Sequence, residues 1–171
     1  MDDFSRLILA WDLKTDMTGV SLEDVVQQAV DYTGMTDVPL EDRTVLLSDN
    51  GAGYICQQFN EYLRLVGIKH INASPFHPQT NGKIERYHRT LKGEINQLPY
   101  EMPSELKEAI RAFINYYNYQ RYHEGLGNVT PFDVYTGRHL AIFQKRQEVK
   151  SKTLADRKSY NRKARTKSKD P

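Results

Sequence analysis

"SPFHPQTNGKIERYHRTLK", residues 74–92, joins a proline-broken polar loop to the start of a helix. The helix is predicted over about residues 82–98, because apolar residues recur there at three- and four-residue steps and so form one stripe. That stripe consists of Ile84, Tyr87, Leu91, Ile95 and Leu98. The remaining surface carries one carboxylate, Glu85, with Arg89 at i+4 and Lys92 at i+7. The pattern predicts a core-packed helix with a charged face around Glu85.

Upstream of this stretch, three short apolar runs alternate with two helical patterns. The runs are residues 7–13, 44–48 and 68–72. Their length and their content of β-branched, aromatic or aliphatic residues are typical of strands. One helix is predicted over residues 21–33, with Ser21 as N-cap and Gly34 at its end, and another over about residues 54–66. Strands that alternate with helices usually pair in parallel through right-handed crossovers, so we expect an α/β fold.

Downstream, Pro103 begins another helical pattern, and "TPFDVYTG", residues 130–137, is typical of a short helix with proline at its first position. Between them, "NYYNYQRYH", residues 115–123, has aromatic residues at helical spacing. Core packing is favoured over stacking on nucleic acid for three of them, Tyr116, Tyr117 and Tyr119. The roles of Arg121 and His123 stay open.

The charge of the chain is divided between its two ends. Residues 1–137 hold 12 Lys/Arg and 19 Asp/Glu, a net charge of −7, whereas residues 138–171 hold 12 and 3, a net charge of +9. We expect a folded domain over residues 1–140 and a basic tail over residues 141–171 that is flexible or partly helical. Such a tail is either a solvated segment or an arm that binds phosphates, and the composition leaves both open.

The cysteine content and the length of the apolar runs exclude some classes of protein. The single cysteine, Cys56, argues for a reducing compartment and against a disulfide framework or a cysteine-based zinc site. The longest apolar run, residues 7–11, is far shorter than the roughly 20 residues that cross a bilayer. We therefore expect a cytoplasmic, nucleoid-associated protein with no membrane partner.

Two carboxylates stand out. Asp49 ends the strand predicted at residues 44–48, and 35 residues separate it from Glu85. The intervening helix, strand and loop are enough to bring the two side chains together at one end of the sheet. Adjacent carboxylates repel unless a cation lies between them, and Mg²⁺ or Mn²⁺ suits such a site and also binds substrate phosphates. The alternative is that Glu85 and Arg89 form only a surface ion pair on one helix.

Four motifs together resemble the catalytic core of retroviral-type integrases, in the branch of bacterial insertion-sequence transposases of the DDE class. They are "DDFSR" at 2–6, "LLSDNGAGY" at 46–54, "SPFHPQTNGKIERYHRTLK" at 74–92 and "YNYQRYHEGLGNVTPFDVYTG" at 117–137. Residue types, order and spacing all agree over roughly residues 2–140. The resemblance implies a ribonuclease H-like fold, with a mixed sheet and flanking helices.

The resemblance also implies the chemistry and the site. Asp49 and Glu85 are similar to the second and third metal carboxylates of the family, which binds two Mg²⁺ or Mn²⁺ ions about 3.5–4 Å apart and cleaves and joins DNA strands. It further implies that His77, Asn81, Lys83, Arg89 and Lys92 contact DNA, and mainly its phosphates. The expected partners are transposon ends, target DNA and further copies of the full-length chain.

The resemblance does not extend to the first metal-binding Asp of the family. The first metal Asp of the family lies on a strand before the segment matched by "DDFSR", so we expect this chain to lack the first strand and most of the second. Asp2, Asp3, Asp12 and Asp16 are rejected as substitutes. We therefore expect the chain alone to be inactive. The competing hypothesis is a non-catalytic DNA-binding or partner-binding remnant, and a nuclease acting on RNA–DNA hybrids has only the fold behind it.

Overall fold

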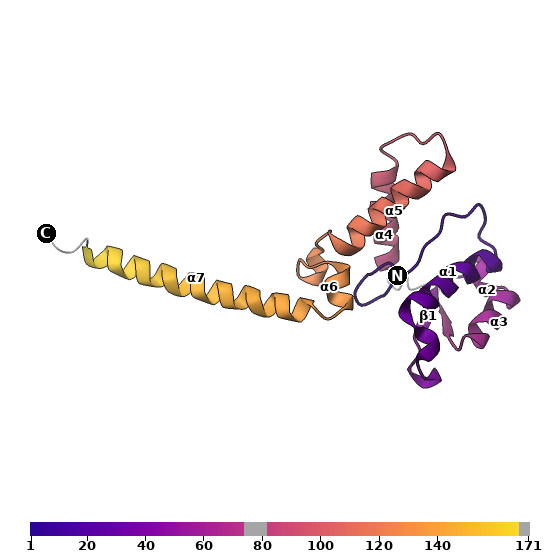
Figure 1. Ribbon diagram of the computed structural model, residues 1–171, viewed down its shortest axis with the longest axis horizontal. Coiled ribbons are helices and arrows are strands. Elements are labelled where there is room, and N and C mark those ends of the chain that lie inside the picture. Colours follow the sequence, from indigo (N-terminus) through magenta and orange to yellow (C-terminus); the bar gives the residue numbers. More distant parts are fainter. Residues whose placement is uncertain (74–81, 168–171) are drawn as a thin grey trace.

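The computed structural model describes residues 1–73 and 82–167, with side chains described as far as residue 163. The regular elements are α1 (Gly19–Thr33), η1 (Met35–Asp37), η2 (Leu40–Asp42), β1 (Val45–Ser48), α2 (Ala52–Ile55), α3 (Gln57–Leu65), β2 (Lys69–Asn72), α4 (Gly82–Ile95), α5 (Pro103–Tyr119), η4 (Glu124–Leu126), α6 (Pro131–Tyr135) and α7 (His139–Lys167). Figure 1 shows α1 to α3 with the strands at one end, α4 to α6 beside them, and α7 projecting away.

The sheet of the described residues has two strands, both predicted from the sequence. β1 and β2 pair in parallel, with Val45 opposite Lys69 and Ser48 opposite Asn72. The chain crosses between them through α2 and α3. One face of the pair packs on α1 and α3, while Leu47 and Ile71 on the other face are 39% and 55% exposed.

The strand predicted at residues 7–13 does not form. Leu7 and Ile8 are buried, as a strand would require, but the backbone of this segment has no strand beside it among the described residues. The peptide groups of Ile8 are instead hydrogen-bonded to the side-chain amide of Asn118 in α5, at 3.0 Å each. The prediction was wrong because apolar content reports burial, whereas a strand also needs a neighbouring backbone.

The first of two apolar cores lies between α1, α3 and the sheet. Its buried members are Val30, Phe59, Leu63 and Ile68. The ring of Phe59 meets that of Tyr54 edge-on, with centroids 5.8 Å apart. This core supports β1, which ends directly before Asp49.

The second core lies between α4 and α5. Its buried members are Ile8, Tyr87, Ile110, Phe113, Ile114 and Tyr117. Tyr117 is thus buried as predicted, but Tyr116 is 48% and Tyr119 is 46% exposed, so the packing prediction was wrong for Tyr116. Tyr119 instead contacts the ring of Phe132 in α6, with centroids 4.9 Å apart. Four members of the predicted α4 stripe, Ile84, Tyr87, Leu91 and Ile95, pack in this core as their periodicity predicted, but the fifth, Leu98, is 66% exposed and lies beyond the end of the helix.

Three helices differ from their predicted limits. α4 ends at Ile95 rather than at residue 98. α1 begins at Gly19, with Thr18 rather than Ser21 as its N-cap, since the Thr18 hydroxyl accepts a hydrogen bond from the Ser21 amide. The helix predicted over residues 54–66 is split into α2 and α3, because Cys56 has an extended backbone with φ −67° and ψ 148°. The spacing of apolar residues does not reveal that a single residue within a helical pattern has an extended backbone.

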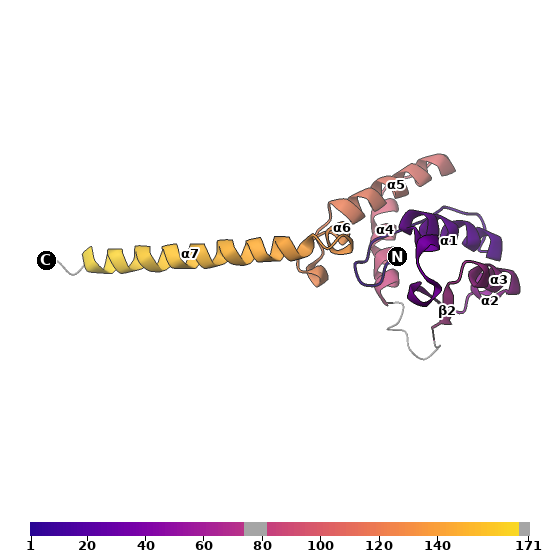
Figure 2. The ribbon, with the colours of Figure 1, turned by 60° about the horizontal axis from the view of Figure 1, so that its bottom comes forward.

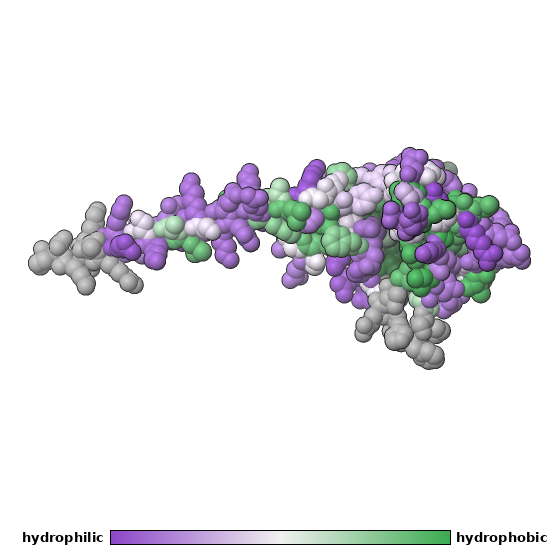
Figure 3. Space-filling model, turned by 90° about the horizontal axis from the view of Figure 1, so that it is seen from below, coloured by the Kyte–Doolittle hydropathy of each residue, from purple (hydrophilic) through white to green (hydrophobic). Residues whose placement is uncertain are grey.

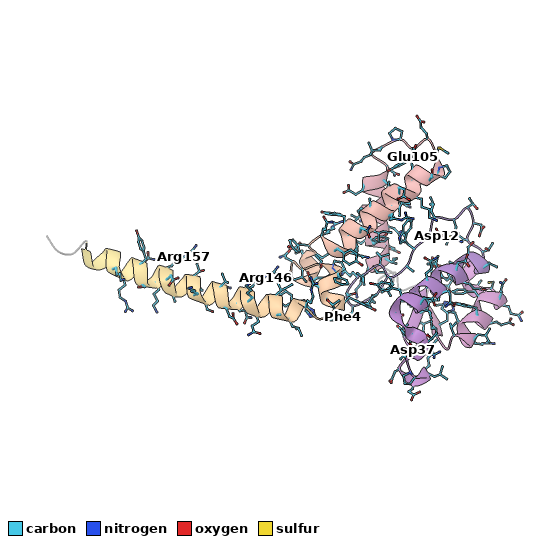
Figure 4. All side chains as sticks on the ribbon, in the orientation of Figure 1. Phe4, Asp12, Asp37, Glu105, Arg146 and Arg157 are labelled. Carbon is cyan, nitrogen blue, oxygen red and sulfur yellow. The ribbon has the colours of Figure 1, made fainter. Side chains whose placement is uncertain are left out.

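α7 is attached to the preceding residues through contacts near its beginning. The Arg146 guanidinium donates to the carbonyls of Gly127 and Asn128, at 2.7 Å each. Beyond this contact the side chains described are exposed. Figure 2 shows the helix extending as an arm, Figure 3 shows its mainly hydrophilic surface, and Figure 4 labels Arg157 on the projecting part. Over residues 1–73 and 82–167, no helix combines the length and the apolar content that a bilayer span requires.

Candidate functional site

Asp49 directly follows β1 and is held in a tight turn. Its Oδ1 accepts a hydrogen bond from the Gly51 amide at 2.9 Å. The turn is tied to the end of β2, because the Asn50 side-chain amide donates to the Ala73 carbonyl at 2.9 Å and the Ala73 amide donates to the Ser48 carbonyl at 2.7 Å. Asp49 is exposed. Its carboxylate is therefore fixed in place and open to solvent.

A buried hydrogen-bond network lies directly behind Asp49. The Ser48 hydroxyl lies 2.8 Å from His70 Nε2 and 2.8 Å from the Asp49 carbonyl. His70 Nδ1 is 3.0 Å from Asn60 Oδ1. Because that oxygen can only accept, Nδ1 carries the proton and Nε2 is an acceptor, so the single hydroxyl hydrogen of Ser48 lies within reach of both Nε2 and the Asp49 carbonyl. Burial lowers the pKa of His70, which keeps the ring neutral.

This network was missed by sequence reasoning, because residues 48, 60 and 70 have no common period. A Ser, His and Asn in series resembles a hydrolytic arrangement, but Ser48 is only 6% exposed. Its hydroxyl is therefore out of reach of a substrate. The network instead joins β1, β2 and α3 and orients the backbone that leads into Asp49.

Glu85 lies in the first turn of α4, and its side chain is exposed. Arg89 and Lys92, which share its face, are exposed as well. In the parts of the chain that the structure describes, no salt bridge joins Glu85 to Arg89. The alternative of a simple i, i+4 ion pair is thus absent from this structure, and Glu85 remains available as a ligand.

The structure places Asp49 and Glu85 on separate elements, and no hydrogen bond links them. Among residues 1–73 and 82–167, no three His, Cys, Asp or Glu side chains converge on a potential metal position. The donor set nonetheless suits a hard cation, since both carboxylates are exposed and Mg²⁺ binds through one or two carboxylates while keeping waters and substrate phosphates. Asp49 and Glu85 could therefore supply two oxygen ligands.

The residues predicted to contact DNA have different environments. Lys83 Nζ forms an ion pair with Asp3 at 2.6 Å and donates to the Asp3 carbonyl at 2.8 Å. A phosphate would have to compete with that carboxylate. Arg89 and Lys92 point away from the core. His77 and Asn81 lie outside the described residues.

The four acidic residues near the start of the chain serve local structure. The Asp2 carboxylate accepts hydrogen bonds from both the amide and the hydroxyl of Ser5, and Asp3 holds Lys83. Asp12 forms an ion pair with Lys107 at 2.7 Å. Hydrogen bonds from Ser21 and Thr18 lower the pKa of Asp16 to about 2. Each of these carboxylates is thus already bonded to a group of the protein.

The fold formed by these elements is similar to that of solved integrase catalytic core domains. The catalytic core domain of BIV integrase superposes with a TM-score of 0.57 and 20% identity, over 81% of this chain and 84% of that one. The HTLV-2 integrase catalytic core domain, solved in complex with magnesium in a trimeric form, gives 0.57 and 21% over 77% and 78%. At this level of identity the likeness establishes the fold alone.

The sequence comparisons name the same domain. Two family profiles, each described as "Integrase core domain", match residues 1–78 and 66–131. The Gag-Pro-Pol polyprotein of Squirrel monkey retrovirus is 34% identical over 98 residues, which is 57% of this chain. That of Mason-Pfizer monkey virus is 33% identical over the same length. Residues 1–131 are thus similar to the integrase core domain, and 98 residues are similar to retroviral polyproteins.

The match to these relatives covers only a small part of each of them. This chain corresponds to 5% of the length of those two polyproteins. The named relatives are retroviral, so the comparisons support the integrase core but not the narrower resemblance to bacterial insertion-sequence transposases. Both Asp49 and Glu85 fall within the matched residues.

Proposed function

We propose that this chain supplies two of the metal-binding carboxylates of a DNA integration or transposition core, which cleaves and joins DNA strands with the help of divalent metal ions. The observation that carries the proposal is the position of two exposed carboxylates, Asp49 at the end of β1 and Glu85 in the first turn of α4. Both lie in an integrase core match. Exposed carboxylates at a strand end and a helix start are suited to binding cations beside a phosphate.

Each residue of the site has an assigned role in this proposal. Asp49 and Glu85 hold Mg²⁺ or Mn²⁺, and bound metal ions stabilise the attacking and leaving oxygens of an in-line displacement at phosphorus. Arg89 and Lys92 lie one and two turns beyond Glu85 on the same face, and they bind the DNA backbone through its phosphates. The hydrogen bonds of Ser48 and Asn50 keep Asp49 in position.

The proposal also covers the branch of the family, the location of the protein and its DNA substrates. The motif spacing favours the bacterial insertion-sequence branch, and with it a cytoplasmic, nucleoid-associated protein that acts on transposon ends and target DNA. Further copies of the chain would bring two DNA ends together. These assignments depend on the resemblance of the motifs.

A second candidate function is DNA binding without catalysis. The basic helix α7 favours it, because residues 138–171 carry a net charge of +9 and the described side chains beyond Arg146 are exposed. Such a helix binds DNA phosphates without reading the sequence, with an affinity that falls steeply as salt increases. In this case the carboxylate pair would be idle.

Strand cleavage and joining assays separate the two candidates. Labelled duplex DNA is incubated with the chain and Mg²⁺ or Mn²⁺, alongside the variants Asp49→Asn and Glu85→Gln and the control Asp37→Asn, which changes an exposed carboxylate in η1. Products that disappear in the first two variants but persist in the control support the catalytic proposal. Products unaffected by either variant contradict the assigned site. If the unaltered chain binds DNA but forms no product, as expected for the chain alone, Mn²⁺ binding that requires both Asp49 and Glu85 supports the first candidate, and its absence supports the second.

A further inference from the structure

A small cavity lies between the start of the chain, α4 and the loop that follows α5. It measures about 50 Å³, and its lining includes Arg6, Lys83, Arg86, Tyr117, Arg121 and His123. A single water molecule needs about 10–15 Å³. The cavity therefore has room for a group of several non-hydrogen atoms, such as one phosphate, but not for a nucleoside.

The lining is strongly cationic. Four of the residues that line it are Lys or Arg, and no Asp or Glu of the described chain is among them. Lys83 is paired with Asp3, but no described carboxylate forms a salt bridge with Arg6, Arg86 or Arg121. Three guanidinium groups without a counter-ion repel one another across a small space, so an anion there would be stabilised.

His123 supplies an independent sign of a missing ligand. Its Nε2 is inaccessible to solvent and has no hydrogen-bond partner among the described residues. Burial lowers the pKa of His123 to about 4, and the positive charges of Arg121 and Arg6 contribute to this shift. Buried polar atoms are rarely left unpaired, and those that are need an explanation. A bound oxyanion would favour the protonated ring, whose Nε2–H could then donate to it, and would offset the cations.

The cavity is also rigid before any ligand binds. Arg6 has the left-handed backbone conformation, with φ 64°, in a turn closed by a 2.8 Å hydrogen bond from the Asp2 amide to the Leu7 carbonyl. Its guanidinium lies against Gly125, where an added Cβ would be 2.7 Å from a terminal nitrogen. On the other side, the Arg121 guanidinium stacks on the ring of Tyr117, 5.9 Å from its centroid.

We propose that this cavity binds a phosphate group, held by the guanidinium groups of Arg6, Arg86 and Arg121. Planar guanidinium groups match the oxygens of phosphate and bind them in pairs. A DNA backbone and free inorganic phosphate present the same tetrahedral oxyanion, so the chemistry of the site is common to both. The site does not depend on a metal ion.

The cavity lies on a different flank of α4 from the candidate metal ligand. With 3.6 residues per turn, Lys83 and Arg86 are centred roughly a third of a turn around the helix from the face shared by Glu85, Arg89 and Lys92. The phosphate site is therefore an addition to the proposed function and can be tested without activity.

The test is calorimetric titration of the full chain with inorganic phosphate at constant ionic strength, with chloride as the competing anion. Arg86→Gln and Arg121→Gln are each expected to weaken phosphate binding about tenfold, the loss of a charge-assisted pair. Arg64→Gln, which removes an exposed charge in α3, is the matched control and is expected to bind as the unaltered chain does. Gly125→Ala displaces Arg6 without removing charge and should weaken binding as well.

Circular dichroism of each variant confirms that it is folded. Absence of saturable phosphate binding to the unaltered chain, or equal affinity in Arg86→Gln and Arg64→Gln, would overturn the proposal. A second titration with short duplex DNA identifies the source of the phosphate. If the site takes a DNA backbone phosphate, Arg86→Gln lowers the salt dependence of DNA binding by about one ion. If only inorganic phosphate binding falls, the site takes free phosphate.

Discussion

The side-chain amide of Asn118 makes both hydrogen bonds to Ile8 that a neighbouring strand would make. Its Oδ1 accepts from the Ile8 amide and its Nδ2 donates to the Ile8 carbonyl, each at 3.0 Å. All of these groups are buried, and 110 residues separate the two positions. One α5 side chain thus fastens an apolar segment that has no strand beside it among the described residues.

We predict that Asn118→Leu lowers the free energy of unfolding by about 2–4 kcal/mol, because two buried backbone groups of Ile8 lose their partners. Urea denaturation followed by circular dichroism measures the change. Asn115→Leu, at an exposed position of the same helix, should cost less than about 0.5 kcal/mol. Equal losses in the two variants would show that the Ile8 pairing contributes nothing.

Asn60→Ala should loosen the turn that carries Asp49. Asn60 donates to the carbonyls of Tyr54 and Cys56, at 3.2 and 2.9 Å, and orients His70. Its loss removes the side-chain partner of the Tyr54 carbonyl and of His70, while the Cys56 carbonyl keeps the amide of residue 60, and we expect a cost of about 2–3 kcal/mol.

Hydrogen exchange provides the local measurement for that variant. We expect faster exchange at the Gly51 amide, because Ser48 is no longer held by an oriented His70. Gln57→Ala, whose side chain bonds only to exposed Glu61 among the described residues, is the control. Unchanged exchange at Gly51 in the Asn60 variant would contradict the assigned role of the network.

His123 should make stability depend on pH in a defined window. Its pKa falls from an ordinary value of 6.5 to about 4 in the folded chain, so the unfolded chain binds the proton more readily between these values. The contribution of His123 is therefore complete above pH 6.5 and is lost as the pH falls toward 4.

In phosphate-free buffer we expect a loss of about 1–2 kcal/mol from His123, after allowing for solvent screening of a half-buried ring. Thermal unfolding at a series of pH values measures it. The variant His123→Gln should show a flatter profile than the unaltered chain over this window, while His70 and His88 titrate in both. Parallel profiles would mean that His123 is not shifted in the folded state.

Much of the fold can be predicted from periodicity. The α4 stripe as far as Ile95, the start of α5 at Pro103, the strands β1 and β2, and the proline that begins α6 were all predicted, because each element is decided by its own residues and by burial of one face. The segment at residues 7–13 was mistaken for a strand, since strand formation also depends on a partner that sequence does not reveal. The break at Cys56 was missed for a similar reason, because it depends on packing around one residue.

Part of the candidate site could be predicted from the sequence, and part could not. Asp49 and Glu85 could be selected from their positions at a strand end and a helix start. The pairing of Lys83 with Asp3 could not, because it joins residues 80 positions apart. The cavity lined by Arg6, Arg86 and Arg121 also brings together distant positions, and only the left-handed turn at Arg6 places the first of them there.

Binding of Mn²⁺, measured by nuclear magnetic resonance, tests most directly whether Asp49 and Glu85 hold a common metal ion. The paramagnetic ion broadens the signals of nearby amides. We predict that the amides around Asp49 and those around Glu85 lose intensity together as Mn²⁺ is added, and that Asp49→Asn abolishes the loss at both places. Broadening at only one of them, or broadening around Glu85 that survives Asp49→Asn, would contradict a shared metal site.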